Sequence, residues 1–123
     1  MIHNEVDREL SRSRRYGGEV SVAWVEIESI TSRSALIEWR QFCARAAASL
    51  REWDTCWMHE DGLFLLLPHT SREAAVRVTG RLLSMLDEIG IESQATTAVF
   101  PSDAPTTDGL IAQLSDSIRE QSA

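Results

Sequence analysis

The chain has 123 residues, of which 43% are hydrophobic and 25% charged, and this composition excludes a disordered or collagen-like protein. A chain of this length is typical of one domain, so we expect a single domain over residues 1–123. Twelve basic residues, all of them arginine, against 19 acidic ones give a net charge of −7. Such an acidic surface disfavours phosphate backbones, and we expect no nucleic-acid partner.

The sequence also disfavours membrane insertion and metal binding. Its longest unbroken apolar run, Leu63–Leu67, is far too short to cross a bilayer, and the first residues lack a secretory signal pattern. We therefore expect a cytoplasmic protein. The two cysteines, Cys43 and Cys56, lack the spacing of zinc ligands and are expected to be buried thiols. No metal site and no cofactor is predicted.

In chain order, the first half predicts a helix, a strand and a second helix. Asn4 can cap a polar helix over residues 4–16, which Gly17 ends. Val20–Glu28 is β-branched and apolar on both faces, as in a central strand, and it ends in Glu26 and Glu28. Steps of three and four residues then predict an amphipathic helix over about 34–51, with an inward stripe of Leu36, Trp39, Cys43, Ala46 and Leu50.

The second half predicts a hairpin, a helix, a strand and a last helix. Trp53–Met58 and Leu63–Leu67 are the predicted hairpin strands, joined by a tight turn at residues 60–62. Thr70 and Glu73 have the spacing of a capping box, which opens a helix that ends at Gly90. Its inward stripe is Ala75, Val78, Leu82, Met85 and Ile89. A strand over 94–100 follows, and then a helix with Leu110, Leu114 and Ile118 inward.

This order of elements predicts an α+β fold. The central β-α-β-β-α-β pattern is ferredoxin-like, with an antiparallel sheet, helices on one face, and additional N- and C-terminal helices. Trp39 lies on a helix stripe, and the other three tryptophans fall in predicted strands. All four are therefore expected to pack in the core or on a face of the sheet: Trp24, Trp39, Trp53 and Trp57.

Several segments resemble the GGDEF domain, the diguanylate cyclase family, whose fold is of the nucleotidyl-cyclase palm type. The charged run 9–17 before a strand that ends in acids resembles the opening of that domain. Arg51–Asp54 and Leu65–Thr70 resemble its middle, and Thr96–Pro101 its final third. The resemblance covers nearly the whole chain and rests mainly on order and spacing.

The family's signature hairpin, Gly-Gly-Asp/Glu-Glu-Phe, is altered in this sequence. Arg15–Val20 looks like the signature but precedes the first strand, so it cannot be the hairpin. The matching position is Glu60-Asp61-Gly62-Leu63-Phe64 when aligned from Phe64, and alignment from Pro68 shifts the match by one residue. Both alignments lose the paired glycines, which let the backbone approach the substrate's phosphates.

Other catalytic parts that the resemblance implies are also altered. Glu26 and Glu28 match the acidic positions of the first strand and are vestigial candidates for metal ligands, although a solvated strand end is the better explanation of both. Glu60 or Asp61 could add a hairpin carboxylate. The family's guanine-reading asparagine and aspartate are absent from residues 30–41. The family's opening segment is absent too, so we expect either a naturally truncated domain or a domain cut from a longer chain. We therefore expect a degenerate domain that is not an enzyme.

Two functions follow from the resemblance. The first is a non-catalytic scaffold or interaction module in a bacterial signalling or secretion system, linked to cyclic di-GMP and to exopolysaccharide or biofilm control. Its partner would be another protein or, in a homodimer, a second copy. The alternative is a cyclic di-GMP receptor that uses an Arg-x-x-Asp product site, Arg51 and Asp54, five residues before Glu60. A helix-end cation and a turn carboxylate explain the same pair. Residual nucleotidyl cyclase activity is a distant third reading.

Overall fold

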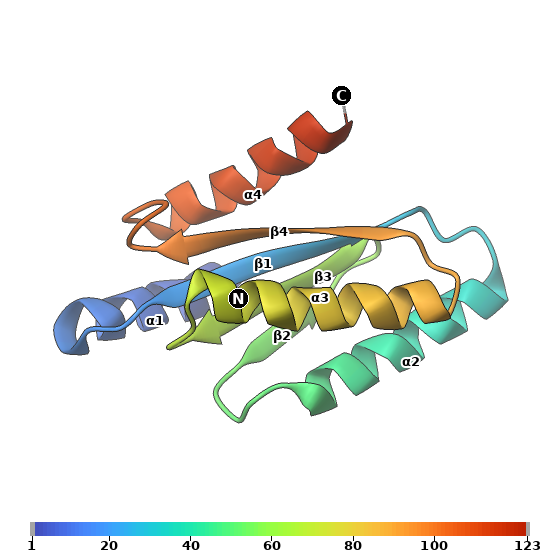
Figure 1. The fold of residues 1–123 in the computed structure, drawn as a ribbon, viewed down its shortest axis with the longest axis horizontal. Coiled ribbons are helices and arrows are strands. Elements are labelled where there is room, and N and C mark those ends of the chain that lie inside the picture. Colours follow the sequence, from blue (N-terminus) through green and yellow to red (C-terminus); the bar gives the residue numbers. More distant parts are fainter. Residues whose placement is uncertain (1, 123) are drawn as a thin grey trace.

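The computed structural model describes the backbone of residues 2–122 and the side chains of residues 2–115. Its elements are α1 (Ile2–Tyr16), β1 (Val20–Ile27), α2 (Arg33–Ser49), β2 (Thr55–Met58), β3 (Gly62–Pro68), α3 (Arg72–Glu88), β4 (Ser93–Phe100) and α4 (Thr107–Ser122). The strands form one antiparallel sheet in the order β2-β3-β1-β4 (Figure 1). The predicted α+β fold and the order of its elements are confirmed.

The two helices of the central pattern, α2 and α3, lie on one face of this sheet as predicted, and the terminal helices α1 and α4 cover the opposite face. The face with Ala23 and Val25 packs against α2 and α3, with Trp39, Phe42 and Leu82 in its core. The opposite face, with Val22 and Phe64, packs against α1 and α4 through Val6, Leu10, Leu110 and Leu114. The reason is already in β1, because a strand that is apolar on both faces must be covered on both.

The predicted cap of α3 is wrong. The Ser71 hydroxyl, one residue later than predicted, accepts the hydrogen bond from the backbone N–H of Ala74. Thr70 is buried, and its hydroxyl donates to the carbonyl of Pro68 at 2.8 Å, so no capping box with Glu73 forms. A buried hydroxyl takes the nearest acceptor, and here that acceptor is at the end of β3.

Two predicted positions near α2 also differ. Leu36 in the first turn of α2 is 37% exposed, and Phe42, which lies outside the predicted stripe, is fully buried beside Trp39, Cys43 and Ala46, which are buried as predicted. Trp53 is 52% exposed and precedes β2. A turn closed by the bond from the Asp54 N–H to the Arg51 carbonyl delays the strand to Thr55.

Both cysteines are free thiols, and Cys43 is buried while Cys56 is half-buried. Desolvation, with a smaller contribution from Cys56, raises the pKa of Cys43 to about 12, so this thiol stays protonated at neutral pH. Over the described residues, no helix has the length and apolar character needed to span a membrane.

Candidate functional site

The end of β1, the β2–β3 hairpin and the start of β4 meet at one end of the sheet. Glu26 pairs with Gly62 on one side and with Gln94 on the other. Beyond the strand, the N–H of Ile27 donates to the carbonyl of Asp61 at 2.9 Å. This sheet end carries five carboxylates: Glu26, Glu28, Glu60, Asp61 and Glu92.

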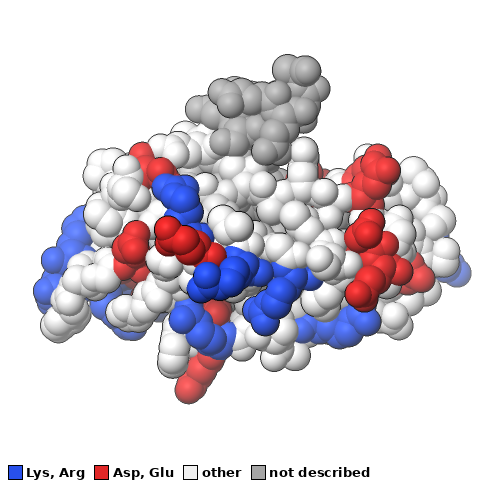
Figure 2. Space-filling model, viewed as in Figure 1, with Lys and Arg blue, Asp and Glu red and all other residues white. Residues whose placement is uncertain are grey.

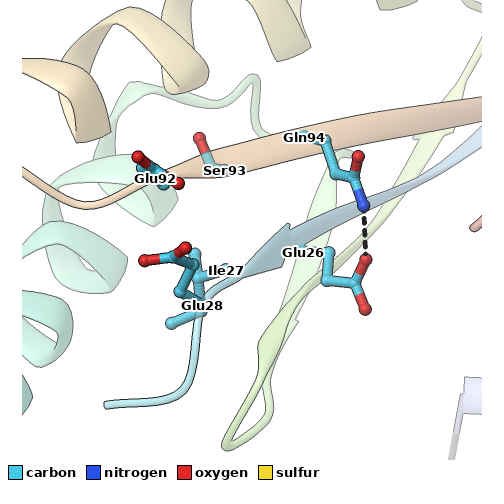
Figure 3. Close-up of a pocket in the computed structure, with 6 residues that line it drawn as sticks. All are labelled: Glu26, Ile27, Glu28, Glu92, Ser93 and Gln94. Carbon is cyan, nitrogen blue, oxygen red and sulfur yellow. Dashed lines mark hydrogen bonds between the residues drawn. The ribbon is translucent and has the colours of Figure 1, made fainter. Parts of the chain in front are cut away.

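Glu26 and Glu28 have different partners (Figure 3). Glu26 accepts a hydrogen bond of 2.8 Å from the side-chain amide of Gln94. Glu28 lies beside Glu92, and the hydrogen bond between the two carboxyl groups, with their mutual repulsion, raises the pKa of Glu28. Both residues line a hollow of about 350 Å³ at the ends of β1 and β4. The two acids that the resemblance makes vestigial candidates for metal ligands are therefore turned to separate neighbours.

The carboxylates do not form the metal site that the resemblance implies. Glu60 and Asp61 are exposed and line a different hollow of about 500 Å³, next to the loop 29–32 and the start of α2. No group of three or more metal-ligating side chains gathers anywhere in the described part of the chain. Since divalent ions in such sites need several oxygen ligands together, this donor set does not fit the implied ions.

The hairpin glycine is needed for packing against β1. A Cβ atom placed on Gly62 would lie 2.4 Å from the carbonyl oxygen of Val25 and 2.6 Å from Cζ2 of Trp24. The indole of Trp24 also meets the His59 ring edge-on, with 5.5 Å between centroids. After this glycine, Leu63 and Phe64 are buried on opposite faces of the sheet. The predicted signature segment thus has an exposed acidic tip and a buried apolar stem.

Arg51 and Asp54 form a bidentate ion pair at the turn before β2. The Arg51 Nε and Nη2 atoms each donate to the Asp54 carboxylate at 3.1 Å, and the Arg51 backbone N–H adds a bond of 3.0 Å. Nη2 also donates to the carbonyl of Pro68 at 3.0 Å and to the hydroxyl of Thr70. The Asp54 side chain is only 2% exposed, whereas Arg51 is 45% exposed. The pair therefore ties this turn to the end of β3.

Three residues at these places were missed by sequence reasoning. Glu92 and Gln94 become the partners of Glu28 and Glu26 because β4 runs antiparallel beside β1. Their polar character at the start of a predicted strand was the available signal. Trp53 lies beside Arg51, whose Cζ is 5.4 Å from the indole centroid. The sequence predicted Trp53 as the first residue of a strand, whereas β2 begins at Thr55.

The Glu28–Glu92 pair predicts a change in pH dependence when Glu28 is replaced by Gln. The raised pKa of Glu28 means that the folded protein holds its proton more tightly than the unfolded chain does. Stability from this group is thus present at low pH and falls as pH rises through the folded pKa. Glu28→Gln should raise the melting temperature at pH 7 more than at pH 4, as measured by circular dichroism. An equal shift at both pH values would contradict this assignment.

No family model and no curated protein matches this sequence. Solved structures do match the fold. A DGC protein from Thermotoga maritima superposes with a TM-score of 0.77 at 14% identity, covering 92% of this chain and 88% of that one. A sensory box/GGDEF family protein from Caulobacter crescentus superposes with a TM-score of 0.79 at 15% identity, covering 99% of this chain and 91% of that one. The chain therefore has the fold of these GGDEF proteins.

Proposed function

We propose that this chain is a non-catalytic domain with a GGDEF-type fold that acts by binding protein in a bacterial signalling or secretion system. This system is linked to cyclic di-GMP and controls exopolysaccharide or biofilm formation. The proposal combines the fold of the structural neighbours with a hairpin end that is poorly suited to a nucleoside triphosphate.

The observation that carries the proposal is the charge of the hairpin end. Glu60 and Asp61 occupy the tip where the family's glycines would face phosphates, and the raised pKa of Glu28 beside Glu92 reflects the same excess of carboxylates. Phosphoryl transfer depends on metal ions and cationic groups that neutralise the transferred phosphate. A tip of this charge repels a triphosphate instead.

The sheet edges support the binding half of the proposal. The sheet ends in β2 on one side and in β4 on the other, and neither strand has an outer neighbour within the described residues. Unpaired strand edges offer rows of N–H and C=O groups to another chain. Apolar side chains near these edges stay about half exposed, among them Met58 at 53% and Val76 at 54%.

We expect the purified chain to produce no cyclic di-GMP from GTP with Mg²⁺ or Mn²⁺, as assayed by chromatography. The double substitution Glu60→Gly and Asp61→Gly should not rescue turnover, because the guanine-reading segment is also absent. An active diguanylate cyclase in the same buffer is the positive control. Product from the unmodified chain that persists after repeated purification would falsify the non-catalytic reading.

Binding of cyclic di-GMP at Arg51 is the second candidate, and one observation favours it. The half-exposed Arg51 guanidinium and the exposed Trp53 indole lie side by side, and planar groups of this kind stack on purine bases. Calorimetry with cyclic di-GMP tests this candidate, with Trp53→Ala as the variant because it leaves the Arg51–Asp54 pair in place. Micromolar affinity that Trp53→Ala abolishes supports a receptor. Absence of heat at high ligand concentration rejects it.

A further inference from the structure

The outer edge of β4 presents unpaired peptide groups at its centre. The Val99 N–H donates to the Asp103 carboxylate at 2.7 Å and its carbonyl accepts from the Asp103 N–H, so the peptide groups of Val99 point away from β1. Because the direction alternates along a strand, those of Ala95 and Thr97 point outward too. No hydrogen bond to these outward groups occurs within the described part of the structure. The edge is thus open at Ala95 and Thr97 and closed at Val99.

A groove runs beside this open edge. It has a volume of about 430 Å³ and lies between β4 and α3, where Val76, Gly80 and Leu83 face the side chains of Ala95 and Thr97. Gly80 leaves open space, since a Cβ atom there would have no neighbour within 4 Å. The groove therefore combines an apolar helix stripe with a hydrogen-bonding strand edge.

The stripe of α3 beside the groove is complementary to itself. Arg72 and Asp87 lie near its two ends, Val76 and Leu83 lie inside them, and Gly80 is at the centre. When two copies of α3 run antiparallel about the midpoint between Thr79 and Gly80, Val76 of each copy meets Leu83 of the other. Arg72, whose Nη2 already pairs with Asp103 at 2.7 Å within its own chain, then comes beside Asp87 of the other copy. In Figure 2, basic side chains gather over the first part of this face, and acidic ones lie toward the end of α3. Opposite charges therefore favour the antiparallel arrangement.

The dimensions of the sheet agree with this arrangement. Helix α3 packs on both β1 and β4. If β4 pairs with β4 of a second copy, the two α3 helices are separated by two strand spacings, or about 10 Å. Packed helices lie about 8–10 Å apart, and a glycine at the contact permits the lower end of that range. A single two-fold dimer can therefore pair the two β4 edges and pack the two α3 helices against each other at the same time.

We propose that the occupant of this groove is a second copy of the chain. The two β4 strands pair antiparallel about Thr96, so that Ala95 of each copy faces Thr97 of the other and one sheet continues across the dimer. The contact is isologous, as a two-fold symmetric dimer requires. A second copy is thus the partner in the protein binding that we propose as the function. The dimer rests on that proposed binding alone, because it does not depend on whether GTP is turned over.

Sedimentation of the full chain over about 1 µM to 1 mM tests the dimer. Val76→Glu places a charge in the stripe, while Arg81→Glu places the same residue on another side of α3, because five residues correspond to about 140° of helix rotation. We expect the wild type and Arg81→Glu to dimerise, and Val76→Glu to dimerise at least about tenfold more weakly. Melting curves check folding of both variants. A wild-type monomer over the whole range, or equal weakening by both substitutions, overturns the proposal.

Amide hydrogen exchange shows which edge is used. With rising protein concentration, exchange at Ala95 and Thr97 should slow, whereas Cys56 and Met58, whose amides point outward on β2, should be unchanged. Slowing at Cys56 and Met58 instead would assign the dimer to the opposite edge. Either failure leaves the turnover assay unaffected, so it is distinguishable from failure of the non-catalytic reading.

Discussion

Gly62→Ala should destabilise the protein by about 3 kcal/mol, at the upper end of what overpacking usually costs. The new Cβ would meet the backbone oxygen of Val25 at 2.4 Å and the indole of Trp24 at 2.6 Å, and the backbone oxygen cannot rotate away. Either β1 or the hairpin must shift, and the pairing of Glu26 with Gly62 is lost with it. Urea unfolding followed by circular dichroism measures this loss directly.

Gly80→Ala is the matched control for this substitution. Gly80 lies in the middle of α3 with open space around it within one chain, so in the monomer, at protein concentrations below those at which the proposed dimer forms, alanine there should stabilise the helix by about 0.5 to 1 kcal/mol. The same chemical change thus has opposite effects at the two glycines. If Gly62→Ala is as stable as the wild type, Trp24 does not constrain the hairpin as the structure indicates.

This result bears on how a glycine in the signature segment is interpreted. A resemblance to the GGDEF family assigns hairpin glycines to the approach of substrate phosphates. Here the retained glycine has a packing reason, since Trp24 lies across it, while the neighbouring Glu60 and Asp61 are exposed. Retention of Gly62 is therefore no evidence for substrate binding, and the non-catalytic proposal does not conflict with it.

The fold could be predicted from sequence because its strongest signals are local. β1 is apolar on both faces, β3 is a short apolar run, and α3 has a regular apolar stripe and a glycine at its end. The errors arose where tertiary contacts compete with local preference. Thr70 has the residue type and spacing of a helix cap, yet its hydroxyl is buried and donates a hydrogen bond to the carbonyl of Pro68.

The candidate site was less predictable because it depends on which strands become neighbours. Glu26 and Glu28 were recognised as acids at a strand end, but their partners come from β4, far along the chain. The sequence also suggests Arg51 and Asp54 as a ligand pair, and only the structure adds that each satisfies the other. Sequence spacing can predict that two residues lie close together, but it does not predict whether their side chains face a ligand or each other.

Arg51→Ala should cost about 2 kcal/mol of unfolding free energy. It removes two charge-assisted bonds to an Asp54 carboxylate that is only 2% exposed, together with the bonds to Pro68 and Thr70. A buried acceptor that loses its partners bears a desolvation cost, although the 45% exposure of Arg51 moderates it. Urea unfolding of Arg51→Ala, Asp54→Ala and the double variant gives the coupling energy, which we expect to exceed about 1 kcal/mol.

Arg8→Ala separates the effect of burial from the loss of an arginine. Arg8 also pairs with a carboxylate three residues away, Glu5, but at 3.5 Å and with side chains that are 65% and 40% exposed, against 2% for Asp54. Its removal should change stability by less than about 0.5 kcal/mol. Equal costs for Arg8→Ala and Arg51→Ala would show that the Arg51–Asp54 pair does not hold the turn. If only Arg51→Ala loses much unfolding free energy, a loss of cyclic di-GMP binding in that variant could come from the disturbed turn and would not prove a binding site. Trp53→Ala, which leaves the Arg51–Asp54 pair in place, is then the informative variant for calorimetry.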